Sequence, residues 1–286
     1  MEYITAMEAA GKWGISDRRV RVLCSQGRIP GAHKDGKSYR IPADATKPAD
    51  GRERGNKQAN DGKQRISPLH NDVESEVAVS LLAELLGVPV CPVVRTVEDT
   101  VFSTFMNDFS KEYIVHFRRL FGGARSDNEY QNLIGVRPQY NDDFARMILL
   151  NFITRQDDRH MSNMAIKIGS GGESFYALYD NGRSLFYEDT EETVREAISD
   201  PAKNATRFGY SGTYWDYVQE IAAARGSLEG LIDLNVGEKE VRAVLTEAGF
   251  TGYRYDGALV WILKTIILIR EHSRRLIIRS AKSNNA

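Results

Sequence analysis

Apolar and polar positions in the first fifty residues alternate in a way that predicts two short helices and a hairpin. A capping box over residues 5–8 predicts a helix from Thr5 to about Lys12. Apolar residues at three- and four-residue spacing predict a second helix that begins after Ser16. Two short runs around Asp35-Gly36 predict a two-stranded hairpin. The chain therefore begins with a small unit that has its own helices and strands.

The rest of the chain predicts mostly helices, with two hairpins between them. Val88–Thr96 and Thr100–Met106 are rich in Val, Thr and Phe and predict one hairpin, and a second hairpin turns through Gly169–Gly172. The expected helices cover residues 74–87, 111–120, 142–153, 188–198, 214–224, 238–248 and 257–276. Together these elements predict an α+β fold whose C-terminal part is mainly helical.

A polar stretch over residues 49–64 separates the two parts. It contains no apolar residue larger than Ala, so it cannot bury surface, and we expect no fixed structure there. The 286 residues of the chain are enough for two domains. We therefore divide the chain into a first domain over residues 1–48, a flexible linker over 49–65 and a second domain over 66–280.

The distribution of charge supports this division. The whole chain has a formal net charge of −1, which by itself argues against a nucleic-acid partner. Residues 1–65, however, hold fourteen Lys and Arg against eight Asp and Glu, a net charge of +6, and the remainder carries −7. The near-neutral total therefore combines a basic first part with an acidic second part.

Several classes of protein are not favoured by the sequence. The first residues lack the basic and apolar regions of a secretory signal. The longest apolar run, Ala258–Ile269, is well short of the roughly 20 residues that cross a membrane. Cys24 and Cys91 are too far apart for a Cys-x-x-Cys site. We expect a cytoplasmic protein that has no membrane partner.

Basic residues gather on the predicted second helix and on the hairpin that follows. The two helices are joined by two or three residues, which is the spacing of a helix-turn-helix, and basic side chains near the start of its second helix can reach bases and phosphates. The residues that we expect at double-stranded DNA are Ser16, Arg18, Arg19, Arg21, Lys34, Lys37 and Arg40. A small helical adaptor with a solvated basic face is the alternative.

The first part resembles the winged helix-turn-helix of MerR-like and excisionase-type DNA-binding proteins. Four separated motifs carry the resemblance, over about residues 2–47: Tyr3-Ile-Thr-Ala-Met-Glu-Ala-Ala, Gly14-Ile-Ser-Asp-Arg-Arg-Val, Gly27-Arg-Ile-Pro-Gly and Tyr39-Arg-Ile-Pro. The resemblance implies a small DNA-binding module. A single module of this kind makes few contacts, so we expect weak binding with a steep dependence on salt.

The second part contains polar residues in an order that suits phosphoryl transfer. Asp158 and Asn163 lie on one loop, and Asp180 follows the second hairpin just before a glycine. Phosphoryl transfer needs a carboxylate that positions the hydroxyl nucleophile and oxygen ligands that hold Mg²⁺. Any one of these residues could be an ordinary surface carboxylate or amide, but their order around a hairpin favours a site.

This order resembles the protein-kinase-like superfamily, and most closely the HipA-like bacterial serine/threonine kinases. Asp158-Arg-His-Met-Ser-Asn163 resembles their catalytic loop, Glu76 to Gly87 resembles a helix of that family, and Leu178-Tyr-Asp180 resembles their metal-binding Tyr-Asp. The Asp-Arg-His spelling is also similar to that of phosphoinositide kinases. The resemblance covers about residues 72–190.

The resemblance implies a role for each matching residue. Asp158 would be the catalytic base, His160 would organise the loop, and Asn163 and Asp180 would bind Mg²⁺. Glu76 would pair with the lysine that holds the phosphates of ATP. Arg159 would either lie near a phosphate or brace the loop.

The sequence departs from the family ahead of Glu76. No strand-like segment with the expected lysine is present, and Lys57 and Lys63 lie in polar sequence, so the N-lobe looks abbreviated. Two functions remain open. One is a DNA-binding HipA-like serine/threonine kinase that uses ATP and Mg²⁺, with autophosphorylation among its expected reactions, in a toxin–antitoxin-like or regulatory setting. The other is a DNA-binding transcriptional regulator with an inactive pseudokinase domain.

Overall fold

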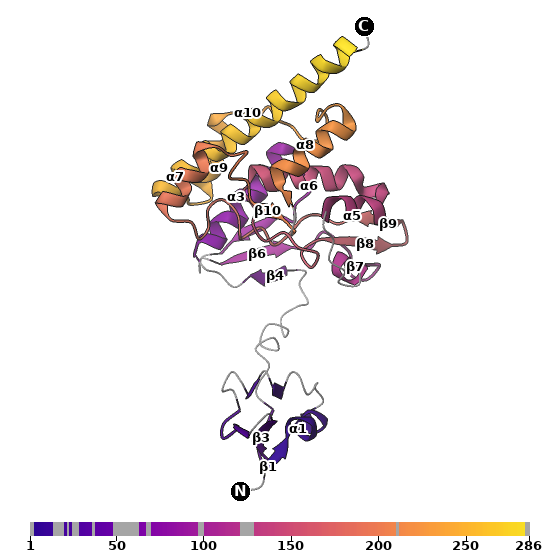
Figure 1. The fold of residues 1–286 in the computed structure, drawn as a ribbon, viewed down its shortest axis with the longest axis vertical. Helices are drawn as coiled ribbons and strands as arrows, with labels where there is room; N and C mark the ends of the chain where they lie inside the picture. The colour runs from indigo at the N-terminus through magenta and orange to yellow at the C-terminus, as the bar shows by residue number, and fades with distance from the viewer. Residues whose placement is uncertain are drawn as a thin grey trace. The chain divides into compact units, whose positions relative to one another are not determined.

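The chain divides into two compact units, Met1–Asp61 and Gly62–Ala286, each of which is considered by itself (Figure 1). The structure, a computed structural model, describes residues 3–13, 20–21, 23–24, 29–35, 38–47, 63–66, 70–96, 100–120, 129–209 and 212–283. Within those residues no helix is both long enough and apolar enough to cross a membrane.

The smaller unit is a three-stranded sheet with a helix. Its elements are β1 (Tyr3–Thr5), α1 (Ala6–Trp13), β2 (His33–Asp35) and β3 (Ser38–Pro42), and the strand order is β1-β3-β2. Thr5 caps α1: its backbone N–H donates to Glu8 Oε2 at 2.7 Å, and its Oγ1 accepts from the Glu8 N–H at 3.3 Å. The predicted helix start and hairpin are therefore confirmed, whereas β1 was not predicted.

The second helix of the smaller unit is only partly described. Val20, Arg21, Leu23 and Cys24 are helical, and Val20 and Leu23 are buried with Ile41 of the sheet. The turn before this helix lies outside the described residues, as do Ser16, Arg18, Arg19 and Lys37. The winged helix-turn-helix therefore stays a prediction.

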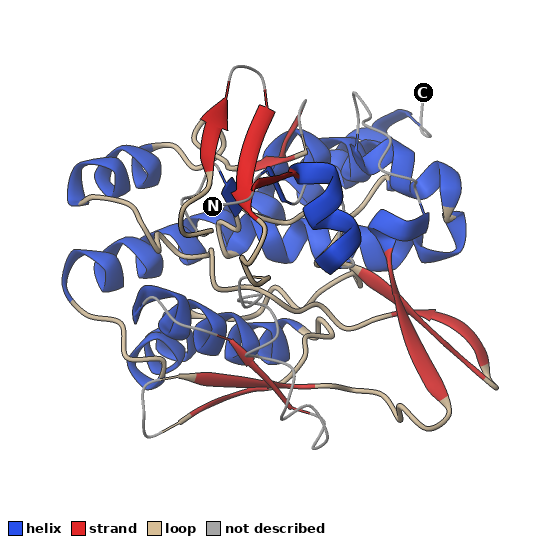
Figure 2. Cartoon of the chain, turned by 90° about the horizontal axis from the view of Figure 1, so that it is seen from below, coloured by secondary structure: helices blue, strands red, loops and turns tan. Residues whose placement is uncertain are grey.

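The larger unit contains two three-stranded antiparallel sheets and a short hairpin. Figure 2 shows the two sheets of the larger unit as separate groups of strands. The first has the order β4-β6-β5 and the second β7-β8-β9. The strands are β4 (Lys63–Ile66), β5 (Val93–Arg95), β6 (Val101–Thr104), β7 (Glu112–His116), β8 (Ala165–Gly169), β9 (Gly172–Phe175), β10 (Arg207–Phe208) and β11 (Gly212–Thr213). A single parallel bridge pairs Val90 with Leu178, just before the Tyr-Asp motif.

Helices form the rest of the larger unit. They are α3 (His70–Leu86), α4 (Phe117–Leu120), α5 (Glu129–Val136), the 3₁₀ turn η2 (Pro138–Tyr140), α6 (Asn141–Ile153), α7 (Glu191–Ser199), α8 (Tyr214–Arg225), α9 (Glu238–Glu247) and α10 (Gly252–Ser283). Nine residues of α6 are buried, and α10 packs across α7, α8 and α9 (Figure 1). The buried helix α6 leads directly into the Asp158 loop.

Two expectations for the larger unit need correction, and one helix was not expected. The segment 111–120 was expected to be one helix, but Glu112–His116 is strand β7, because Ile114 and Val115 suit the sheet position beside β8. Residues 63–66 were expected to belong to a linker or its edge, but they form strand β4, which pairs with β6. Helix α5 was not predicted.

Candidate active site

The Asp158 loop is closed by its own side chains. The buried Asn163 side chain accepts a hydrogen bond from the His160 N–H at 2.9 Å and donates one to the Asp158 carbonyl at 2.8 Å. Gln156 Oε1 accepts from the Asp158 N–H at 2.8 Å, and His160 Nδ1 accepts from the Ser162 N–H at 3.3 Å. This local pattern leaves the Asp158 side chain 41% exposed, where a hydroxyl substrate could reach it.

Arg159 joins this loop to the loop that carries Asp180. Its buried guanidinium donates to the carbonyl of Asn163 at 3.1 Å and to the carbonyl of Tyr179 at 2.7 Å, and it also bonds the side-chain oxygens of Asn151 and Asn181. Burial lowers the pKa of Arg159. In this position the buried guanidinium of Arg159 braces the two loops and does not face a phosphate.

Asp180 presents its carboxylate to solvent at the end of the Tyr-Asp motif. Its backbone has φ of +59°, a left-handed conformation that residues with a Cβ rarely adopt. The carbonyl of Asp180 accepts from Gln156 Nε2 at 3.4 Å. Among the described residues, its exposed carboxylate makes no hydrogen bond or ion pair, so it is free to bind a cation.

Glu76 of α3 holds the same loop from the other side. The buried Oε1 of Glu76 accepts from the Asn181 N–H at 2.7 Å. Burial and the nearby Asp180 raise the pKa of Glu76 to about 7, against the opposing effect of the Asn181 and Gly182 amides. No ion pair joins a lysine to Glu76 among the described side chains, and the side chain of Lys63 lies outside them. The expected lysine partner of Glu76 therefore stays a prediction.

Two further residues of α3 hold the chain beyond Gly182. Ser75 Oγ donates to the Ser184 carbonyl at 2.6 Å and accepts from Arg254 at 2.7 Å. Arg254 also pairs with Glu74 and donates from Nε to the Leu185 carbonyl at 3.1 Å. Sequence analysis missed these contacts, although polar residues at the start of a buried helix were a visible signal.

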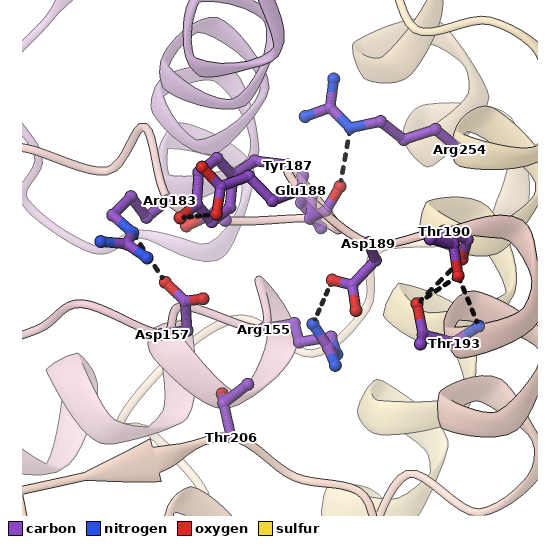
Figure 3. A network of polar contacts seen from close by, with 12 residues as sticks. Arg155, Asp157, Arg183, Tyr187, Glu188, Asp189, Thr190, Thr193, Thr206 and Arg254 are labelled. Carbon is purple, nitrogen blue, oxygen red and sulfur yellow. Dashed lines mark hydrogen bonds and ion pairs between the residues drawn. The ribbon is translucent and has the colours of Figure 1, made fainter. Parts of the chain in front are cut away.

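Arg183 makes an ion pair that sequence analysis also missed (Figure 3). Its Nε lies 3.3 Å from Asp157 Oδ1 and its Nη1 lies 3.8 Å from Asp158 Oδ2, while its guanidinium lies 4.9 Å from the centre of the Tyr187 ring. Burial first, and then the neighbouring Asp158, raise the pKa of Asp157 to about 6, although Arg183 opposes them. Asp157 and Asp158 are adjacent in the sequence. They thus form one charged cluster with Arg183, which is distant in the sequence.

The donor set suits a hard cation held mainly by a substrate. The described residues contain no group of three His, Cys, Asp or Glu side chains that could hold a metal ion alone. Mg²⁺ commonly takes one or two protein oxygens and completes its shell with phosphate oxygens and water. Asn163 Oδ1 and the Asp180 carboxylate are oxygen donors of this kind, so the residues present fit such an ion.

Three of the basic residues expected at DNA are among the described residues of the smaller unit. Arg21 is helical and exposed, Lys34 is on β2 and Arg40 is on β3. Arg40 Nε lies 3.1 Å from Asp35 Oδ2, and both of these side chains are largely exposed. The charge of Arg40 is thus partly balanced within its own hairpin.

Comparison with solved structures gives the fold of the larger part of the chain. The Helicobacter pylori proinflammatory kinase CtkA is similar with a TM-score of 0.57 and 16% identity, over 76% of this chain and 91% of that one. HipA from the Shewanella oneidensis toxin–antitoxin complex with HipB and operator DNA is similar with a TM-score of 0.48 and 16% identity, over 86% of this chain and 64% of that one. No protein-family model and no curated protein matches the sequence.

At this level of identity, the likeness to CtkA concerns the fold. The chain has a mixed α/β architecture with small sheets and many helices, and its fold is similar to that of the kinase CtkA. The predicted kinase-like fold is thereby confirmed. The roles of Asp158, Asn163 and Asp180 and the DNA-binding module are not tested by these comparisons.

Proposed function

We propose that the larger unit transfers the γ-phosphate of ATP to a serine or threonine hydroxyl, and that the smaller unit binds double-stranded DNA. The observation that carries the first proposal is the half-exposed Asp158 carboxylate on a loop that Asn163 closes and Arg159 joins to the Asp180 loop. Kinase folds with such loops use ATP and a divalent ion.

Each residue has a defined task in this reaction. Asp158 orients the acceptor hydroxyl and accepts its proton as the oxygen attacks the γ-phosphorus, while the bond from the γ-phosphorus to the bridging oxygen breaks and ADP leaves. Asn163 and Asp180 supply oxygen ligands, and Mg²⁺, when bound, offsets the charge of the phosphates. His160 and Arg159 keep the loop in place through the backbone contacts that they make.

Phosphate transfer from radiolabelled ATP tests this proposal. The purified chain is incubated with Mg-ATP, alone to detect autophosphorylation and with a generic Ser/Thr acceptor protein. We expect label to be transferred by the wild-type chain and reduced by about 10²-fold or more in Asp158→Asn, because a positioned base contributes roughly that factor. Equal transfer by Asp158→Asn, or none by the wild type, contradicts the proposal.

A second candidate function is a DNA-binding regulator whose larger unit is a pseudokinase. The observation that favours it is the hydrogen bond that Glu76 accepts from the Asn181 N–H. This bond uses one oxygen of a carboxylate that pairs with a lysine in kinases. Stabilisation by Mg-ATP in a thermal-shift titration, without phosphate transfer, would select this function.

DNA binding is tested separately by gel shift at several salt concentrations. The full chain is compared with the triple variant Arg18→Ala, Arg19→Ala, Arg21→Ala, and with Arg195→Ala as a control from an exposed helical ion pair of the larger unit. We expect the triple variant to bind less tightly and to show a shallower dependence on salt, since each lost phosphate contact lowers the slope by about 1. Binding that does not depend on salt contradicts the proposal.

A further inference from the structure

Segment 182–189 lies against the start of the Asp158 loop and is bonded to it through the backbone. The Asp157 N–H donates to the Arg183 carbonyl at 3.1 Å, and the Leu185 N–H donates to the Thr154 carbonyl at 2.9 Å. These two bonds fix the position of the Arg183 backbone, from which its side chain projects, relative to Asp157. The direction in which Arg183 points is therefore set by the path of the whole segment.

Two consecutive residues of this segment have a left-handed backbone. Leu185 has φ of +52° and Phe186 has φ of +63°, and both side chains are buried. Such a conformation is unfavourable for residues with a Cβ and persists only where the surroundings fix it. Here Arg254 bonds the Leu185 carbonyl, and the Arg155 guanidinium lies 4.6 Å from the centre of the Phe186 ring.

Arg183 is the cation that contacts both adjacent carboxylates. Among the described residues, neither Asp157 nor Asp158 forms an ion pair with any other base, and Arg155 is paired with Asp189 at 2.7 Å instead (Figure 3). Two neighbouring carboxylates repel each other, and an opposite charge within about 4 Å favours the ionised form of each. Loss of Arg183 would therefore leave an unbalanced pair beside the acceptor hydroxyl.

The geometry indicates that Arg183 supports Asp158 and does not block it. The shortest contact from Arg183 to Asp158 is 3.8 Å, to Oδ2, which is an ion pair and too long for a hydrogen bond. The Arg183 side chain is itself 47% exposed and stacks against Tyr187 at the edge of the cluster. Arg183 thus lies beside the Asp158 carboxylate without covering it, and the 41% exposed side chain of Asp158 stays open to a hydroxyl.

We propose that Arg183 is a positioning residue: it holds Asp157 and Asp158 as a charge-balanced pair and makes the reactivity of Asp158 depend on the conformation of segment 182–189. This inference rests on the proposed phosphoryl transfer and adds a positioning residue to it.

The test compares Arg183→Met and Arg183→Lys with the wild type and with Arg242→Met. Arg242 is a matched control because it is 51% exposed and ion-paired to Glu238, so its loss removes the same charge elsewhere. We expect kcat to fall by about tenfold or more in Arg183→Met, as a slightly misplaced group can cost that much, with the KM for ATP unchanged. Arg183→Lys should recover part of kcat, because it restores the charge but not the planar fork.

The pH profile separates positioning from a purely structural role. In Arg183→Met we expect the acidic limb of kcat to move to higher pH, because Asp157 loses the cation that lowers its pKa and binds a proton more tightly. The other charged or titratable groups near Asp157 and Asp158, which are unchanged in the variant, are Arg155 on the preceding turn, Tyr187, Glu188 and Asp189 on the segment, and Tyr214 on α8. A higher kcat in Arg183→Met, or an unmoved profile with unchanged kcat, overturns the proposal.

A second readout is independent of activity. Carboxyl ¹³C NMR titration of the full chain follows the Asp157–Asp158 pair, with Asp157→Asn and Asp158→Asn used for assignment. We expect the titration midpoint of Asp157 to rise in Arg183→Met and to stay in place in Arg242→Met. If the wild type transfers no phosphate, the proposed function fails while this titration still decides whether Arg183 balances the charge of Asp157, and an unmoved midpoint overturns that idea.

Discussion

The Asp158 loop and segment 180–189 meet at one site, but they are held in different ways. Asn163 and Gln156 close the Asp158 loop by bonds to residues two to five positions away. The 180–189 segment, besides its bonds to residues 154–157, is held by residues more than one hundred positions earlier on α3 and about seventy later on α10. The comparison teaches that the first loop carries its geometry within itself, whereas the second takes its geometry from the packing of distant helices.

Replacement of Arg159 should have the largest effect, because this side chain joins the two regions. Arg159→Met removes the donors that serve the buried Asn163 carbonyl and the partly buried Tyr179 carbonyl. We expect the free energy of unfolding to fall by about 3–5 kcal/mol, the usual cost of breaking a buried charged network. Urea denaturation measures it, with the exposed Arg195→Met as control; a loss below about 1 kcal/mol would show that the two regions are joined elsewhere.

Asn163→Ala tests whether the Asp158 loop is self-contained. The variant leaves the His160 N–H and the Asp158 carbonyl without their partner, which should cost about 2 kcal/mol. Hydrogen exchange should accelerate at the His160 amide and stay unchanged at the Asn181 amide. Ser162→Ala is the control at a neighbouring position. Equally faster hydrogen exchange at the Asn181 amide would show that the two regions are not held in different ways.

Glu76 provides the corresponding test for the 180–189 segment. Glu76→Ala removes the acceptor of the Asn181 N–H and should lower stability by about 2 kcal/mol, with faster exchange at Asn181 and little change at His160. Glu76→Gln keeps an acceptor oxygen, and because burial already disfavours the charge of Glu76, we expect a loss within about 1 kcal/mol. Equal losses for the two variants would mean that the charge of Glu76, and not its oxygen, holds the segment.

The smallest effect is expected from the titration of Asp157, because its side chain is 34% exposed and solvent screens its interactions. The folded protein raises its pKa from 3.8 to about 6, so between these values the folded state binds a proton that the unfolded state has lost. This carboxyl therefore favours folding below about pH 4 and loses that contribution as the pH rises through about 6. The melting temperature of the wild type minus that of Asp157→Asn should decrease between pH 4.5 and pH 7. A difference that stays constant or increases over this range would contradict the raised pKa of Asp157.

The difference between the two regions also explains which parts of the site the sequence could predict. Asp158 and Asn163 stand at a spacing that itself produces the closed loop, so the motif was enough to pick out both residues. Arg183 and Arg254 act only after α3, α10 and the 182–189 segment have packed together, and nothing near either residue in the sequence indicates its partners.

The same reasoning applies to the fold. The capping box at Thr5, the hairpin of β5 and β6 and the buried helix α6 follow from local patterns, and they were predicted. Strands β4 and β7 were not predicted, because a short polar strand such as Lys63–Ile66 becomes a strand only by pairing with β6. Segments of four or five residues take the structure of their neighbours when their own preference is weak.

The parallel bridge between Val90 and Leu178 has a mechanical consequence. It lies between the two three-stranded sheets, and two further bonds reinforce it: the Cys91 N–H donates to the Leu178 carbonyl at 2.7 Å, and the Leu178 N–H donates to the Pro89 carbonyl at 3.0 Å. Asp180 follows this bridge by two residues, so the bridge ties the backbone from which its carboxylate projects to the chain that enters β5.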